Sequence, residues 1–319
     1  FQPGSVTFWD SGQVTTFGCF PFGQPNTVRP ARLPRFGPAR VMIVGVYPSA
    51  WHVSWKAPAY LASRSSGGSV AALAVDVELE VFWNGDTDSF SPMLNQWRAV
   101  TGFVDGDHAG AHGWIGPRSP SANGSSGAKV EERYLRPLGI PVSQTAFTDV
   151  YPVFVVKRSK SGKRREQGDA IAVEYDSIAQ DIGRQPSTLP PRPSTGALVA
   201  GAIERFSDRI VDDLEAADAP LIISLGDEAL QVLSQIPALQ PRPPARTITE
   251  TYGTEYGRPG SLTVNGTAVQ WIALAHPGLL KGKPRPVPIS PAKRSGPGWN
   301  WVHEQWAREA RPDVSGNRS

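Results

Sequence analysis

The chain has 319 residues, of which 39% are hydrophobic and 19% charged, so it can form a sizeable core and is not a disordered polyelectrolyte. Its formal net charge of +3 and pI of about 9.0 permit nucleic-acid binding without requiring it. The single cysteine, Cys19, excludes both an intrachain disulfide and a cysteine-ligated iron–sulfur cluster.

Localisation is predicted from the same features. No apolar run approaches the roughly 20 residues that span a bilayer. The opening Phe-Gln-Pro-Gly lacks the basic and apolar regions of a signal peptide. With one cysteine, these features predict a cytoplasmic protein with no membrane partner, and we expect a monomer. No cofactor is expected.

Four short apolar runs are the predicted strands. Each is five or six residues long, contains β-branched or aromatic residues and is followed within two residues by Gly or Pro. Runs of this kind are typical of strands buried on both faces of a parallel sheet. They are Val41–Val46, Thr145–Val150, Leu221–Leu225 and Trp271–Ala275.

Helical patterns lie between and after these runs. Apolar residues recur every four positions from Leu198 to Leu214, which predicts an amphipathic helix. A second helix is predicted over Asp227–Ile236, with Asp227 and Glu228 in its first turn, and a third has Trp299 and Trp306 on one face. Alternating strands and helices predict an α/β fold with right-handed parallel crossovers.

The remaining segments complete the domain prediction. Residues 51–130 are interpreted as a long elaboration after the first strand, with a possible strand at Ala74–Trp83. Asn265-Gly266 predicts a tight hairpin turn. We expect residues 1–319 to form a single domain that ends in a flexible tail at 312–319.

Functional sites of open parallel sheets form outside the carboxyl ends of the strands, so four loops are expected to converge. They are Gly45–Ala50, Asp149–Pro152, Gly226–Ala229 and His276–Leu280. Their order along the chain (Gly-x-x-Pro, Asp, Leu-Gly-x-x-Ala and His-Pro-Gly) resembles the uracil-DNA glycosylase superfamily. That resemblance implies a three-layer α/β/α sandwich around a four-stranded parallel sheet. It also implies a DNA glycosylase activity, in base excision during DNA repair.

The resemblance also implies roles for particular residues. Gly45–Ser49, which includes Tyr47 and Pro48, matches the loop that holds the water and the flipped sugar. Asp149 stands where the family usually has an Asn that reads the base edge, and His276 matches the His that hydrogen-bonds the base oxygen. Leu279 and Leu280 match the wedge inserted into DNA, and Asn123–Gly127 resembles the family's Gly-rich loop.

Further roles follow from the chemistry of the side chains. Tyr47 and Tyr151 are candidates to stack on a base. Lys281, Lys283 and Arg285 are candidates to bind phosphates. A second basic cluster, Lys157–Arg165, is either a phosphate contact or a solvated loop.

Two departures from the family pattern matter. No carboxylate lies between Gly45 and Pro48 to position water. Asp149 replaces an amide, and an ionised carboxylate accepts hydrogen bonds but cannot donate them. It therefore suits an amino group better than the O4 atom of uracil. Alternatively, Asp149 activates the water or is protonated because of burial.

Structural explanations remain open beside these roles. His276 and Asp149 also fit a structural histidine and a turn-bracing aspartate, Tyr47 and Tyr151 also fit packing residues, and Leu279 and Leu280 also fit the core. His108-x-x-x-His112 has the spacing of a zinc pair, but the surrounding glycines disfavour a helix, so no metal site is expected.

Three functional hypotheses follow. The first is a glycosylase that cleaves the N-glycosidic bond of a damaged or unusual base in DNA. The second is a catalytically inactive nucleic-acid-binding protein on the same fold. The third is a small-molecule enzyme or nucleotide-binding protein that shares only the sheet architecture.

Overall fold

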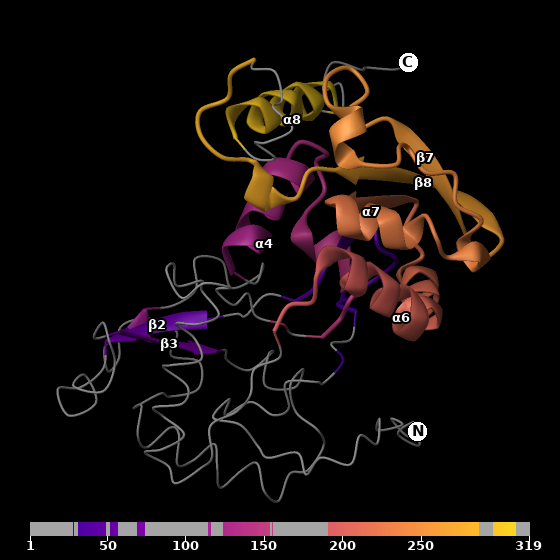
Figure 1. Ribbon diagram of the computed structural model, residues 1–319, viewed down its shortest axis with the longest axis horizontal. Helices are drawn as coiled ribbons and strands as arrows, with labels where there is room; N and C mark the ends of the chain where they lie inside the picture. Colours follow the sequence, from indigo (N-terminus) through magenta and orange to yellow (C-terminus); the bar gives the residue numbers. More distant parts are fainter. Residues whose placement is uncertain are drawn as a thin grey trace, which may run out of the picture.

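The computed structural model describes residues 31–48, 126–153, 191–286 and 296–310, together with Val28, Val155 and the backbone of residues 52–56, 69–73, 114–115 and 124–125. Within these residues the chain has a mixed α/β fold (Figure 1). Among the described helices, none has both the length and the apolar character needed to cross a membrane.

The main sheet has five strands in the order β5-β1-β6-β8-β7. Four of them run parallel and correspond to the four predicted runs: β1 (Val41–Gly45), β5 (Thr145–Asp149), β6 (Leu221–Leu225) and β8 (Thr267–Leu274). The fifth, β7 (Pro259–Val264), pairs antiparallel with β8.

The predicted four-stranded sheet is therefore wrong by one strand. Asn265 and Gly266 both have positive φ angles, 51° and 71°, as a tight hairpin turn requires. This turn lays β7 along β8, so that the hairpin continues the parallel sheet at its edge. The hairpin was predicted, but its membership of the main sheet was not.

The sheet carries the core because its central strands are apolar throughout. Val41, Met42 and Val44 of β1, the strand between β5 and β6, are fully buried. Trp271 of β8 is also fully buried, and its indole N–H donates to Ser224 on β6. A buried indole with a bonded N–H adds a large apolar area at no polar cost.

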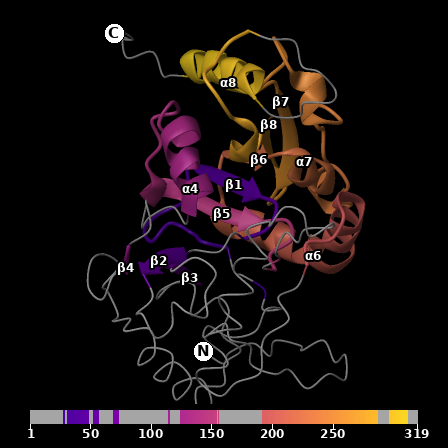
Figure 2. The ribbon, with the colours of Figure 1, turned by 60° about the vertical axis from the view of Figure 1, so that its left-hand side comes forward.

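Helices lie on both faces of this sheet (Figure 2). The helix α4 (Gly124–Val130), the π-helical turn η2 (Glu131–Leu135) and α8 (Pro297–Glu309) lie on one side. The other side is covered by α6 (Thr195–Ala217) and α7 (Asp227–Leu233). The start of α4 at Gly124 means that the Gly-rich segment Asn123–Gly127 is mostly helix rather than a loop before one.

The long helix α6 follows the pattern expected from its sequence. Every fourth residue is buried, and the Ser194 hydroxyl caps the first turn by accepting from the Ala197 N–H at 3.3 Å. The helix α7 ends at Leu233, earlier than predicted. Asp227 does not cap it, because its carboxylate accepts from the Ile248 N–H at 2.7 Å and so anchors the turn η5 (Ile248–Thr251).

Within residues 51–130 the structure describes a second, three-stranded antiparallel sheet of order β3-β2-β4. It consists of β2 (His52–Lys56), β3 (Ser69–Leu73) and β4 (Trp114–Ile115). The possible strand Ala74–Trp83, the pair His108 and His112, the basic cluster Lys157–Arg165 and the predicted tail 312–319 lie outside the described residues.

Candidate functional site

The four predicted loops leave the same edge of the sheet. Gly45 at the end of β1 is in register with Asp149 at the end of β5, and Leu225 of β6 is in register with Leu274 of β8. Backbone hydrogen bonds continue past the strand ends, because Tyr151 donates to Val46 at 2.8 Å. The loops after Gly45, Asp149, Leu225 and Leu274 therefore converge.

Gly45 makes room for the side chain of Asp149. A β-carbon on Gly45 would overlap Oδ1 of Asp149, so no other residue fits at this position unless the carboxylate moves. Arg209 of α6 also lies near Asp149. Burial lowers the pKa of Arg209, while the charges of Asp213 and Asp149 act in the opposite direction. Asp149 is thus fixed between a glycine surface and a cation.

Tyr47, on the loop after β1, is held by Arg192, which precedes α6. The guanidinium carbon of Arg192 lies 5.5 Å from the centre of the Tyr47 ring, within cation–π range. Arg192 also forms an ion pair with Glu228 at 2.6 Å, and the Thr195 hydroxyl donates to the same carboxylate oxygen at 3.2 Å. Three separate chain segments therefore meet at the wall formed by Tyr47.

The electrostatics of the Tyr47 hydroxyl show how close these groups are. Burial raises its pKa, and the charge of Arg192 and a hydrogen bond with it lower that value. The carboxylates of Glu228 and Asp149 both add to the increase in the Tyr47 pKa. Two carboxylates and one guanidinium therefore surround one half-buried tyrosine.

His276 is fixed by its own loop. Its Nδ1 atom accepts a hydrogen bond from the Gly278 N–H at 3.0 Å, which starts the 3₁₀ turn η6 (Pro277–Leu279). A neutral imidazole that accepts at Nδ1 carries its proton on Nε2 and donates from there. A β-carbon on Gly226 would lie 3.3 Å from Cβ of His276, which places the loop after β6 beside His276.

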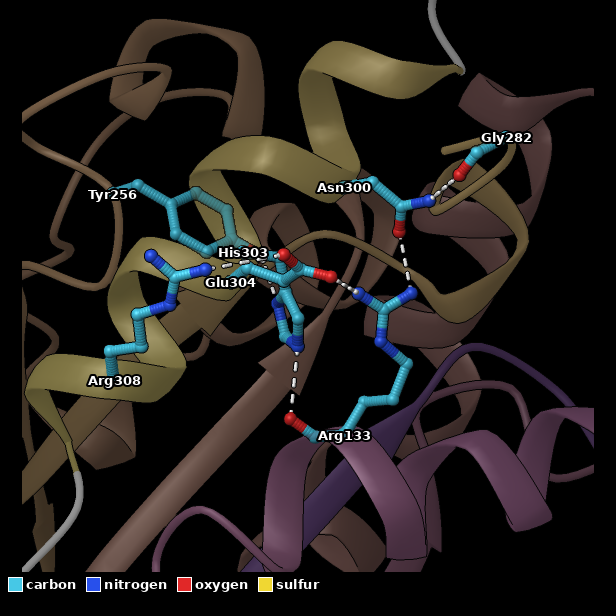
Figure 3. A network of polar contacts seen from close by, with 7 residues as sticks. All are labelled: Arg133, Tyr256, Gly282, Asn300, His303, Glu304 and Arg308. Atoms are coloured by element: carbon cyan, nitrogen blue, oxygen red, sulfur yellow. Dashed lines mark hydrogen bonds and ion pairs between the residues drawn. The ribbon is translucent and has the colours of Figure 1, made fainter. Parts of the chain in front are cut away.

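A buried network supports the strand end that leads to His276. The Ala275 N–H donates to the Tyr256 hydroxyl at 3.0 Å, and the Ala275 carbonyl accepts from the Tyr134 hydroxyl at 2.6 Å. The Tyr256 hydroxyl lies 2.9 Å from Nδ1 of His303, and Nε2 of His303 lies 3.1 Å from the Arg133 carbonyl (Figure 3).

The direction of these bonds follows from the carbonyl group, which can only accept. Nε2 of His303 must donate to the Arg133 carbonyl, so in the neutral ring Nδ1 accepts from Tyr256. Burial lowers the pKa of His303 to about 4 and so keeps the ring neutral. Two smaller effects oppose each other, because the hydrogen bond to the Arg133 carbonyl raises this pKa and the Arg133 charge lowers it.

The segment after His276 is attached to α8 and η2. The Arg133 guanidinium donates to Oδ1 of Asn300 at 2.5 Å, while the Asn300 amide donates to the Gly282 carbonyl (Figure 3). Gly296 donates to the Leu279 carbonyl at 3.0 Å. These bonds fix the backbone from which Lys281, Lys283 and Arg285 project, and all three are exposed.

Other predicted site residues are placed as follows. Tyr151 is only 9% exposed and packs edge-on against Phe206, so it is a core residue and offers no stacking face. Leu280 is 4% exposed and belongs to the core, which leaves the half-buried Leu279 as the wedge candidate. Pro48 is buried, and Ser49 lies outside the described residues.

Arg192 and Glu228 were not predicted as site residues. Glu228 lies in Gly226–Ala229, one of the four loops predicted to converge, but it was assigned to the first turn of a helix rather than to the site. Arg192 lies in a Pro-rich segment that has no motif, so nothing in the sequence could have identified it. In the described part of the chain, no group of three or more His, Cys, Asp and Glu side chains is arranged to hold a metal ion.

Comparison with family models and curated proteins identified no relative of this chain. No family model matches this chain, and no curated protein matches it.

Proposed function

We propose that this protein is a DNA glycosylase-like hydrolase that cleaves the N-glycosidic bond of a damaged or unusual base. The observation that carries the proposal is the geometry of His276. Because its Nδ1 accepts from Gly278, the neutral ring donates from Nε2 at the edge where the strands end. A donor directed at the base oxygen stabilises the negative charge that develops as the base leaves.

The proposal extends to the fold. We assign the chain to the uracil-DNA glycosylase-like type, with β7 added to its four parallel strands and residues 51–130 inserted after the first strand. The order of the strands that end at Gly45, Asp149, Leu225 and Leu274, all at one edge of the sheet, supports this assignment.

In this proposal Asp149 reads the base and Tyr47 forms the wall of the pocket. An ionised Asp149 accepts hydrogen bonds, which favours a base that carries an exocyclic amino group. Its position against Gly45 leaves the carboxylate little freedom, as selective recognition requires. Tyr47 presents an aromatic ring whose orientation is maintained by Arg192.

The basic loop after His276 would bind the DNA backbone. Extrusion of a base from the stack costs a few kcal/mol, which contacts on either side must offset. Lys281, Lys283 and Arg285 are exposed on one short segment and can contact successive phosphates. Leu279, next to them and half-buried, is the residue positioned to fill the vacated space.

One observation favours the second candidate function, a DNA-binding protein without catalysis. The loop between Gly45 and Pro48 offers Val46 and Tyr47, and neither side chain can activate water. The same loops would then bind an extruded base and leave it attached.

An activity screen tests the proposal. The protein is incubated with single- and double-stranded oligonucleotides that contain uracil, hypoxanthine, xanthine and other altered bases, and abasic sites are then cleaved. Strand scission that His276→Ala abolishes supports the glycosylase. DNA binding without scission supports the second function, and absence of both contradicts each of them.

A further inference from the structure

The first loop lacks a carboxylate, but the loop after the neighbouring strand β6 carries Glu228 in the first turn of α7. We propose that Glu228 is the catalytic carboxylate that orients and deprotonates the attacking water. This inference rests on the proposed base hydrolysis. Arg192 and Thr195 act as its positioning residues. This role separates water activation, at Glu228, from base recognition, at Asp149.

The first support is the way one oxygen of Glu228 is held. Oε1 accepts from the Arg192 guanidinium at 2.6 Å and from the Thr195 hydroxyl at 3.2 Å. The Glu228 and Arg192 side chains are only 20% and 17% exposed. Two donors on one oxygen fix the plane of the carboxylate in a largely buried setting, which is what a general base requires.

The second support is the environment of the other oxygen. Within the described residues, Oε2 of Glu228 receives no hydrogen bond. A β-carbon on Gly226 would lie 3.9 Å from this Oε2 and 3.3 Å from Cβ of His276. His276 and Oε2 of Glu228 therefore both lie close to Gly226.

The third support is the link to Tyr47. Arg192 contacts both the Tyr47 ring and Glu228, so the wall of the base pocket and the carboxylate are held by one guanidinium. The charge of Glu228 also acts directly on the Tyr47 hydroxyl. A base stacked on Tyr47 would thus have its sugar near the water held by Glu228.

The reaction balances with these groups alone. As the oxygen of water bonds to C1′ of the sugar, Glu228 takes one water proton. The bond between C1′ and the base nitrogen breaks, and its electron pair leaves with the base. The Nε2–H of His276 stabilises the base anion through its oxygen, and the proton held by Glu228 returns to the base through solvent. The products are the free base and an abasic site.

Single-turnover base release tests this assignment, with the substrate taken from the screen. We expect Glu228→Gln to lower the rate by at least ~100-fold, the usual contribution of a general base. DNA affinity and thermal unfolding should stay close to those of the wild type. The pH–rate profile should also lose the limb on which the rate rises with pH. The conservative Glu228→Asp should keep that limb at a lower rate.

The matched control is Glu204→Gln, the same chemical change at an exposed position of α6, for which we expect an unchanged rate. A folded Glu228→Gln protein with the wild-type rate and pH profile would overturn the assignment while leaving the glycosylase intact. So would loss of the rising limb in Asp149→Asn alone. If the wild type releases no base from any substrate, the proposed function itself fails, and this assignment fails with it.

Discussion

The hydroxyl of Tyr134 donates a 2.6 Å hydrogen bond to the carbonyl of Ala275, the residue directly before His276. Tyr256 accepts from the N–H of the same residue, so two buried tyrosines hold one peptide segment from opposite sides of the chain. The last strand of the sheet therefore ends in a rigid support. The position of His276 is therefore fixed by residues that are distant from it in the sequence.

The two tyrosines make different contributions, so their substitutions should differ. Tyr256→Phe leaves both the Ala275 N–H and Nδ1 of His303 without a partner, whereas Tyr134→Phe leaves only one carbonyl. An unsatisfied buried polar group costs about 1–3 kcal/mol. Urea unfolding should show a larger loss of stability for Tyr256→Phe. Equal losses, or none, would mean that these bonds do not support the strand end.

Stability should fall in mildly acidic solution because of His303. Burial lowers its pKa in the folded protein to about 4, from an ordinary value of 6.5. Its contribution is therefore fully present above pH 6.5 and is lost progressively as the pH falls toward 4, by roughly 3 kcal/mol in total. The measurement is the free energy of unfolding between pH 4 and pH 8 for the wild type and for His303→Gln. Identical pH dependence in the two proteins would contradict this account.

A methyl group at Gly45 should disturb Asp149. Gly45→Ala drives a β-carbon into the Asp149 carboxylate, and overpacking of this kind costs about 1–3 kcal/mol. The control is Gly196→Ala, because nothing lies within 4 Å of a β-carbon at that exposed position of α6. Thermal unfolding should show a lower midpoint for Gly45→Ala only. Two unchanged midpoints would show that Asp149 moves freely.

The basic loop should account for part of the salt dependence of DNA binding. Removal of one phosphate contact lowers the slope of log affinity against log salt by about 0.9. We expect this change for Lys283→Ala, which is exposed after His276. We do not expect it for Arg136→Ala, which is exposed on another segment, directly after η2. Fluorescence anisotropy at several salt concentrations measures the slopes. Equal slopes for the two variants would exclude phosphate binding by the basic loop.

The parallel strands and the long helix could be predicted from local sequence. Val41–Gly45 and Leu221–Leu225 are short apolar runs that end at a Gly or Pro turn, and such runs need no distant information to be identified. The helix α6 was equally clear from its four-residue repeat. The convergence of the loops then followed from the general rule for parallel sheets.

Contacts between distant segments could not be predicted. The pair Arg192–Glu228 joins residues 36 positions apart, and His303 lies 170 positions from Arg133. Neither pair leaves a periodic or spaced pattern in the sequence. Packing and site roles stayed open for Tyr151 and Leu280 for a related reason. The direction of a side chain after a strand end depends on the helix packed against it, as Phe206 is against Tyr151.

The most direct test of the central claim is mass-spectrometric detection of the free base released from the active oligonucleotide by the wild type and by His276→Ala. We expect intact free base and an uncleaved abasic strand from the wild type, and at least ~100-fold less base from the variant. If the wild type releases no free base, or if His276→Ala releases it at the same rate, the loops at these strand ends do not form a glycosylase site.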